Sequence, residues 1–171
     1  MDAKRDQVTN APRLGRYTID AANSTVAFSS RHLFGLMPVR GTFAIRSGTV
    51  DVAEPLADSS LRVEIAAASF HTGKEHRDGD VRSAKFLDAG RHPDITFVST
   101  SVEPAAVTGT LTVCGVEKPV SLSIGRADVS PGVFTVRATT RVDRTEFGVT
   151  AARGLAGRYL DLSLEVTCVH R

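Results

Sequence analysis

The feature that most constrains the fold is a strict alternation of apolar and polar residues that recurs along the chain. Its clearest example lies near the C-terminus, where Leu160, Leu162, Leu164, Val166 and Cys168 alternate with Asp161, Ser163, Glu165 and Thr167. A period of two places successive side chains on opposite faces of a β-strand, whereas an amphipathic helix needs a period near 3.6. The pattern therefore predicts an antiparallel sheet with one buried face and one solvated face.

The same alternation, broken by turn residues, predicts about eight or nine strands. In chain order they cover residues 17–19, 25–30, 39–50 with a bend at Gly48, 61–65, 95–102, 107–113, 120–124, 133–142 and 160–168. Cys114-Gly115 and Ser130-Pro131-Gly132 have the composition of tight hairpin turns, so sequential strands are expected to pair as a meander. The charged interval 71–92 interrupts the pattern and predicts short helical turns or a long loop, and such loops tend to be functional.

A sheet of this many strands has to cover its apolar face. Packing against a second sheet and closing into a barrel both satisfy that requirement, and the residues alone leave the two open. In a sandwich the phenylalanines would interdigitate as core. In a closed barrel of about eight strands the interior can instead hold an apolar ligand.

Length and charge narrow the classes of protein. The 171 residues are enough for one domain, with residues 1–15 expected as a flexible leader and 16–171 as a single domain. The 21 Lys and Arg residues nearly balance the 19 Asp and Glu residues, which disfavours nucleic acid as a partner. The chain has neither a signal-peptide pattern nor an apolar run long enough for a membrane span. We therefore expect a cytoplasmic protein whose two cysteines, Cys114 and Cys168, are reduced.

The histidines make an enzymatic function an alternative to ligand binding. His71 and His76 are five residues apart, a spacing that does not put them on one helix face, and His32 and His92 lie elsewhere in the sequence. A metal site is therefore not expected. The alternatives to a binding protein are an enzyme that uses these histidines or a metal in the same barrel, and a ligand-free scaffold that acts through the apolar bend 33–37.

Four segments form a more specific pattern. They are YTIDAANSTVAFSSRHLFGLMPVRGTF (17–43), residues 63–102 with the block Pro93-Asp94-Ile95-Thr96-Phe97, residues 107–122 with GTLTVCGVEKPV, and RVDRTEFGV (141–149). This pattern resembles the YceI family of lipocalin-like proteins. The resemblance implies an all-β, lipocalin-like antiparallel barrel of about eight strands around an apolar tunnel, with short helices in the 71–92 interval. It also implies binding of long polyisoprenoid chains, including polyprenyl phosphates and isoprenoid quinones, a homodimer, and no catalytic residues.

The expected function is therefore the non-catalytic binding, storage or transport of a long-chain isoprenoid lipid, with no cofactor besides that ligand. The expected apolar wall consists of Phe28, Phe34, Leu36, Met37, Phe43, Phe70, Phe86 and Phe97. The expected contacts to the lipid head are Arg31, His32 and Arg82. A register shift of one residue would reverse the inner and outer faces of each strand, so the faces are the least constrained part of this prediction.

Overall fold

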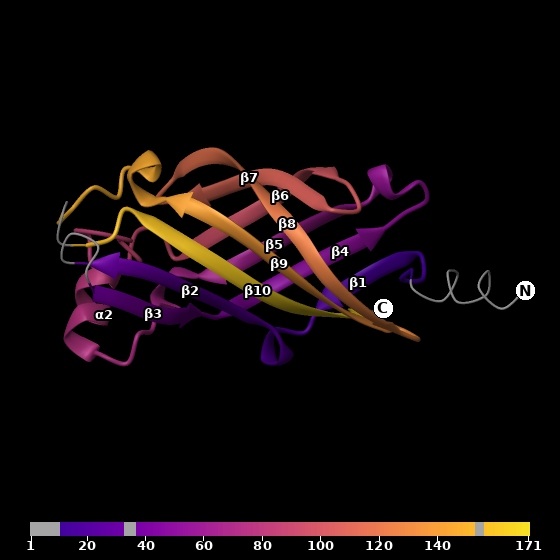
Figure 1. Cartoon of the computed structure of the whole chain (residues 1–171), viewed down its shortest axis with the longest axis horizontal. Helices are drawn as coiled ribbons and strands as arrows, with labels where there is room; N and C mark the ends of the chain where they lie inside the picture. The colour runs from indigo at the N-terminus through magenta and orange to yellow at the C-terminus, as the bar shows by residue number, and fades with distance from the viewer. Residues whose placement is uncertain (1–10, 33–36, 153–155) are drawn as a thin grey trace, which may run out of the picture.

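A computed structural model of the chain describes residues 11–32, 37–152 and 156–171 (Figure 1). The strands are β1 Gly15–Ile19, β2 Thr25–His32, β3 Met37–Phe43, β4 Ile45–Val52, β5 Ser60–Ala66, β6 Asp94–Val102, β7 Ala106–Val113, β8 Val116–Ser130, β9 Val133–Asp143 and β10 Tyr159–His170. The helical elements are α2 Glu75–Arg82 and the 3₁₀ turns η1 Ala21–Asn23, η2 Leu56–Asp58, η3 Ala67–Ser69 and η4 Arg144–Phe147.

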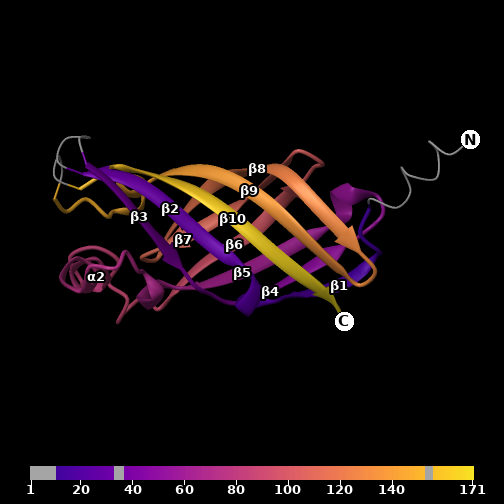
Figure 2. The ribbon, with the colours of Figure 1, turned by 60° about the horizontal axis from the view of Figure 1, so that its bottom comes forward.

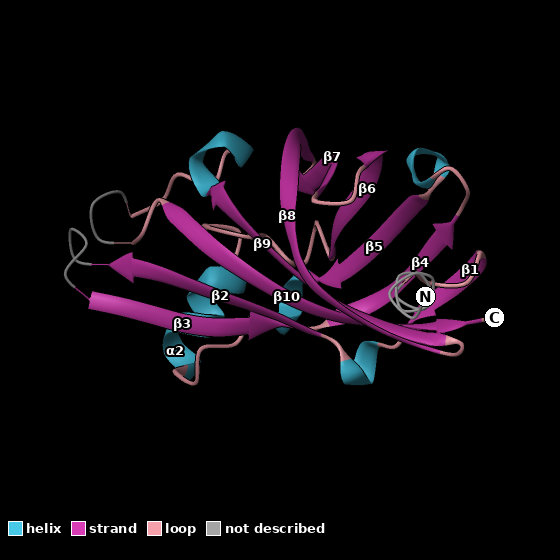
Figure 3. Cartoon of the chain, turned by 45° about the vertical axis from the view of Figure 1, so that its right-hand side comes forward, coloured by secondary structure: helices cyan, strands magenta, loops and turns pink. Residues whose placement is uncertain are grey.

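The strands form a closed antiparallel barrel. Strands β1, β4, β5, β6, β7, β8, β9 and β10 pair in that order, and β10 pairs back with β1. One edge of β10 pairs with two strands. Residues 168–170 pair with β1 and residues 161–165 pair with β2, and β3 lies beside β2. Two pairs of short strands, β1 with β2 and β3 with β4, therefore share single positions, so ten strands fill eight positions around the ring. This confirms the predicted barrel of about eight strands (Figures 2 and 3).

The predicted strand 39–50 is interrupted at Ala44, not bent at Gly48. The chain leaves the ladder with β2 at this point and enters the ladder with β1 and β5. The Ala44 amide instead donates to Ser69 Oγ at 2.7 Å. Gly48 serves close packing, since a Cβ atom there would lie 2.4 Å from Ile19 Cδ1. Alternation within one strand carries no information about which neighbour it pairs with, so the break was not predictable from it.

Both predicted hairpin turns are confirmed. Cys114 and Gly115 have positive φ angles of 52° and 75° and join β7 to β8. A two-residue hairpin turn whose twist matches that of the strands requires positive φ angles at both residues. Gly132, at φ 74°, joins β8 to β9. In the interval 71–92, the structure has one α-helix, α2. None of the helices in the described ranges is long and apolar enough to cross a membrane.

The two ends of the barrel differ in what fills them. At the end away from α2, Tyr17 packs edge-on against Phe134 with ring centroids 4.7 Å apart. The Tyr17 hydroxyl donates to the Arg13 carbonyl at 2.8 Å, so its polar atom is satisfied. At the other end lie α2 and the turns that join the strands there (Figure 1). In the described part of the chain the two buried charged side chains are Asp78 and Arg144.

Candidate ligand-binding cavity

An apolar cavity of about 420 Å³ lies inside the barrel at the α2 end. Aromatic rings form much of its wall: Phe28, Phe43, Phe70, Phe86 and Phe147. Phe28 stacks on Phe70 with centroids 5.1 Å apart, and Phe43 lies 5.5 Å from each of them. A cavity of this size and lining is typical of sites for small apolar or amphiphilic ligands.

Asp78 holds α2 at one flank of the mouth. Its carboxylate is 1% exposed and accepts hydrogen bonds from the Thr72 amide at 2.9 Å and the Thr72 hydroxyl at 2.5 Å. Burial acts to raise the pKa of Asp78, but the Thr72 hydrogen bonds and the charges of His71 and Arg82 outweigh it, so the pKa lies below its ordinary value. The carboxylate therefore stays ionised at neutral pH.

The segment that carries Thr72 is itself tied to the barrel. The amide and carbonyl of His71 exchange hydrogen bonds with Thr42 of β3 at 3.0 and 2.8 Å. Arg82, at the end of α2, donates through Nε and Nη2 to the Phe70 carbonyl at 3.2 and 2.5 Å. The α2 flank is thus attached to β3 through this short segment.

Arg144 holds the opposite flank. Its guanidinium is buried and donates to the carbonyls of Gly157 at 2.7 Å, Val149 at 2.9 Å and Ala156 at 3.3 Å. The guanidinium also lies 5.6 Å from the centroid of the Phe86 ring, a cation–π distance. One side chain therefore fastens the chain that follows η4 to the start of β10.

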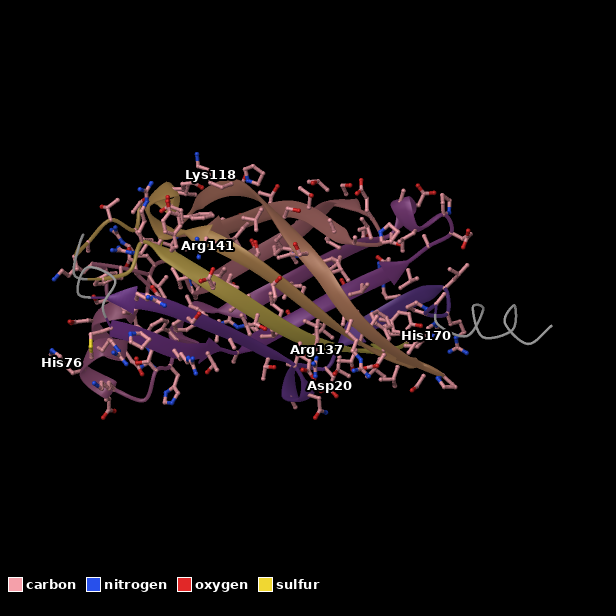
Figure 4. All side chains as sticks on the ribbon, viewed as in Figure 1. Asp20, His76, Lys118, Arg137, Arg141 and His170 are labelled. Atoms are coloured by element: carbon pink, nitrogen blue, oxygen red, sulfur yellow. The ribbon has the colours of Figure 1, made fainter. Side chains whose placement is uncertain are left out.

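The polar groups of the cavity gather at its mouth. His76, Arg77, Asp80 and Lys85 come from α2 and the residues after it, and Arg144 comes from η4. Figure 4 shows His76 at this end of the molecule, opposite His170. Arg77, Lys85 and Arg144 are cationic at neutral pH and Asp80 is the one carboxylate among the lining residues, so the mouth favours an anionic group next to the apolar interior.

Only some of the predicted wall residues line the cavity. Phe28, Phe43, Phe70 and Phe86 line the cavity, whereas Met37 is 49% exposed on β3. Phe97 is buried but does not line the cavity. Phe34 and Leu36 lie outside the described residues. Whether any of these side chains contacts a ligand stays a prediction.

Of the predicted head contacts, Arg31 and Arg82 do not line the cavity. Arg31 is exposed on β2, and Arg82 is engaged with the Phe70 carbonyl. The His32 side chain lies outside the described part of the structure. Sequence reasoning missed Arg144, and it did not choose Arg77 and Lys85 of the charged 71–92 interval as head contacts. It also missed the apolar wall from the C-terminal half, which includes Leu111, Val113, Val142, Leu160 and Leu162. Alternation in 160–168 had marked the two leucines as buried, and that pattern could have found them.

The two thiols are poor nucleophiles. Burial, with the nearby charge of Asp88, raises the pKa of Cys114, whose Sγ donates to the Leu87 carbonyl at 3.1 Å. Burial raises the pKa of Cys168 to about 12. Both are therefore protonated at neutral pH. Within the described residues, no three His, Cys, Asp or Glu side chains form a group that could hold a metal ion.

Comparison with known sequences finds one family over nearly the whole barrel. The model of the YceI-like domain matches residues 17–168. A UPF0312 protein of Pseudomonas fluorescens is 34% identical over 165 residues, which cover 85% of this chain and 82% of that protein. Protein YceI of Escherichia coli O157:H7 is 34% identical over 168 residues, which cover 91% of this chain and 87% of its own length.

Comparison with solved structures finds the same fold. BcnA of Burkholderia cenocepacia superposes with a TM-score of 0.73 at 22% identity, covering 87% of this chain and 98% of its own. A polyisoprenoid binding domain from Saccharophagus degradans, described as implicated in plant cell wall breakdown, gives a TM-score of 0.72 at 16% identity. That match covers 93% of this chain and all of the other. At these identities the likeness supports the fold.

Proposed function

The chain belongs to the YceI family, and from that premise we propose that it is a non-catalytic protein that binds an isoprenoid lipid for storage or transport. The lipid is a polyprenyl phosphate or an isoprenoid quinone, and it needs no further cofactor. Its chain lies in the barrel cavity and its head lies at the mouth beside α2. The homodimer and the cytoplasmic location expected from the sequence stay predictions.

The observation that carries this proposal is an apolar, aromatic-walled cavity at the α2 end with charged side chains among its lining residues. The stacked Phe28 and Phe70 rings form part of the apolar wall that a hydrocarbon chain would contact. Transfer of such a chain from water is favourable by about 25 cal/mol per Å² of buried area, or on the order of 2 kcal/mol per isoprene unit before ordering costs. The interior therefore supplies affinity without specific polar contacts.

The charges at the mouth favour a phosphate over a neutral quinone head. Arg77 and Lys85 line the mouth together with Arg144, and Asp80 is the acidic residue among them. Guanidinium groups form paired, charge-assisted hydrogen bonds with phosphate oxygens. We therefore place the phosphate between the α2 and η4 flanks, in place of the head contacts expected from the sequence.

The protein's own lipid is the direct test of this function. Purified protein is extracted with organic solvent and the extract is analysed by mass spectrometry. We expect an isoprenoid amphiphile in near-stoichiometric amount, and uptake of added polyprenyl phosphate by protein that has been stripped of lipid. If neither is found, the ligand-free scaffold is favoured. Stoichiometric metal that disappears in His71→Ala or His32→Ala would favour the enzyme instead.

A further inference from the structure

Three neighbouring strands present their outer face beside the cavity mouth. The end of β2 and the starts of β3 and β10 lie at the α2 end of the barrel (Figures 1 and 2). Ser30 of β2, Val39 of β3 and Leu160 of β10 line the cavity. Because side chains alternate along a strand, the residues next to these three point away from the cavity. The outer surface at this end is therefore a part of the molecule that the proposed ligand does not use.

Two cations and two large apolar side chains are exposed at this place: Arg31, Arg40, Met37 and Tyr159, hereafter the mouth rim. Met37 is 49% exposed and Tyr159 is 45% exposed. The Tyr159 carbonyl accepts a hydrogen bond at 3.0 Å from Ser30, the residue before Arg31. Arg31 in turn pairs with the residue that follows Met37. The mouth rim is thus a continuous strip across β10, β2 and β3.

Two guanidinium groups lie against the exposed Tyr159 ring. Arg141 Cζ and Arg158 Cζ are 5.4 and 5.3 Å from the ring centroid, which are cation–π distances. Arg141 also pairs with Asp161 at 2.8 Å, and Arg158 pairs with Asp143 at 2.9 Å. The ring is therefore positioned by its neighbours even though it is half exposed to solvent.

The two cations of the mouth rim differ from most arginines on the barrel surface. Seven exposed arginines of the described chain pair with an Asp or a Glu. No ion pair among the described residues involves Arg31 or Arg40, and neither β2 nor β3 contains an acidic residue. Their charge is therefore uncompensated, and it adds to that of Arg77 and Lys85 in the mouth.

An exposed tyrosine beside uncompensated cations suits the surface of an anionic bilayer. The ring is apolar at one end and polar at the other, which matches the headgroup region, and the cations are attracted by anionic lipids. Resting on the function proposed above, we infer that the mouth rim docks on an anionic membrane surface, so that the cavity opens toward the bilayer that supplies or receives the isoprenoid. The chain then passes between bilayer and cavity with less apolar surface exposed to water.

Vesicle binding tests the requirement for charge. Lipid-free protein is mixed with vesicles of phosphatidylcholine alone, or of phosphatidylcholine and phosphatidylglycerol at about 7:3, and bound protein is measured by flotation. We expect binding to the anionic vesicles to be stronger by about tenfold or more. We expect about 1 M salt to abolish this difference, because it screens the attraction between exposed charges.

Two double variants locate the charges that matter. Arg31→Gln with Arg40→Gln removes both cations of the mouth rim and should weaken binding to anionic vesicles by about tenfold or more. Arg13→Gln with Arg171→Gln is the matched control, because it removes two exposed arginines, before β1 and after β10, at the end away from α2. The control should bind as the wild type does. Thermal melts show that both variants are folded.

Tyrosine fluorescence identifies the face that docks. The chain has two tyrosines and no tryptophan, and Tyr17 is 1% exposed at the end away from α2. Anionic vesicles whose phosphatidylcholine carries bromine atoms in its acyl chains should therefore quench the emission of Tyr159 and leave that of Tyr17. Tyr159→Phe keeps the ring and should still bind these vesicles, but its remaining emission should not be quenched.

The outcomes separate this inference from the proposed function. Equal binding to neutral and anionic vesicles, or equal losses in the two double variants, overturns the docking. Bound protein without quenching, or quenching that persists in Tyr159→Phe, overturns the assignment of the mouth rim. No binding to any vesicle overturns the docking and favours a protein partner for the rim. None of these results affects isoprenoid found by extraction. Protein that docks through the rim but neither contains nor takes up an isoprenoid overturns the proposed function and leaves the docking surface.

Discussion

The two flanks of the cavity mouth are fastened by opposite charges. On the α2 flank a buried carboxylate, Asp78, accepts hydrogen bonds from Thr72, six residues before it. On the η4 flank a buried guanidinium, Arg144, donates to three main-chain carbonyls between residues 149 and 157. A carboxylate only accepts and a guanidinium only donates, so each suits the main-chain groups that its flank leaves unpaired.

The difference has a physical consequence. The carboxylate titrates within the accessible pH range, whereas the guanidinium stays charged. Asp78 also holds a short local segment, while Arg144 closes a longer stretch of chain that includes Val149 and Gly157, which line the cavity. Acid should therefore weaken the hydrogen bonds that hold the α2 flank. The Arg144 anchor of the η4 flank should not titrate, and it fixes more of the residues that line the cavity.

Removal of the guanidinium should have the largest effect. Arg144→Ala leaves the carbonyls of Val149, Ala156 and Gly157 without a charged donor, and we expect a loss of about 3–5 kcal/mol in the free energy of unfolding. Urea denaturation measures it. Arg144→Lys is the control: it keeps the charge without the planar fork and should recover part of the loss. A loss under 1 kcal/mol in Arg144→Ala would show that these bonds do not hold the flank.

Neutralisation of the other anchor should cost less. Asp78→Asn keeps the size of the side chain but offers a weaker acceptor to Thr72, so we expect a loss of about 2 kcal/mol at pH 7. The same variant should also release bound isoprenoid faster, because α2 lines the mouth. An unchanged unfolding energy would contradict the assignment of Asp78 as the anchor of α2.

Acid should abolish the difference between wild type and Asp78→Asn. The pKa of Asp78 is lowered in the folded state, so its contribution is complete above the unfolded pKa of about 3.9 and disappears as the pH falls through the lower folded value. Urea midpoints of the two proteins should therefore begin to converge below about pH 4. The corresponding difference for Arg144→Ala should not change in this window, and parallel pH profiles for all three proteins would contradict the comparison.

The smallest change removes one hydroxyl of the α2 anchor. Thr72→Val removes the hydroxyl that donates to Asp78 and accepts from Arg77 Nε, and it leaves the hydrogen bond from the Thr72 amide to Asp78, which is 2.9 Å long. We expect a loss of about 1 kcal/mol, and Thr72→Ser, which keeps the hydroxyl, serves as the control. An unchanged free energy of unfolding in Thr72→Val would show that this hydroxyl does not stabilise the α2 flank.

Much of the barrel was predictable from sequence because strand formation is local. The period of two in 160–168 and the Cys114-Gly115 turn depend on neighbouring residues, and both predictions are confirmed. The break at Ala44 depends on which strands meet there, and no local pattern carries that information. Partner choice in a sheet is decided by the whole fold.

The site was less predictable, for the same reason. Arg144 is flanked by polar residues in the sequence, and its burial depends on carbonyls that lie five or more residues further along the chain. Phe28 and Phe97 are both buried, yet Phe28 lines the cavity and Phe97 does not. Alternation predicts which face is buried but not whether a buried ring borders an empty volume.

A crystal structure of the protein with farnesyl monophosphate would test the central claim most directly. We predict electron density for the chain inside the barrel between Phe28 and Phe86, with the phosphate beside Arg77 and Lys85. Density for the ligand on the outer face of the barrel, with the interior unchanged, would contradict the account.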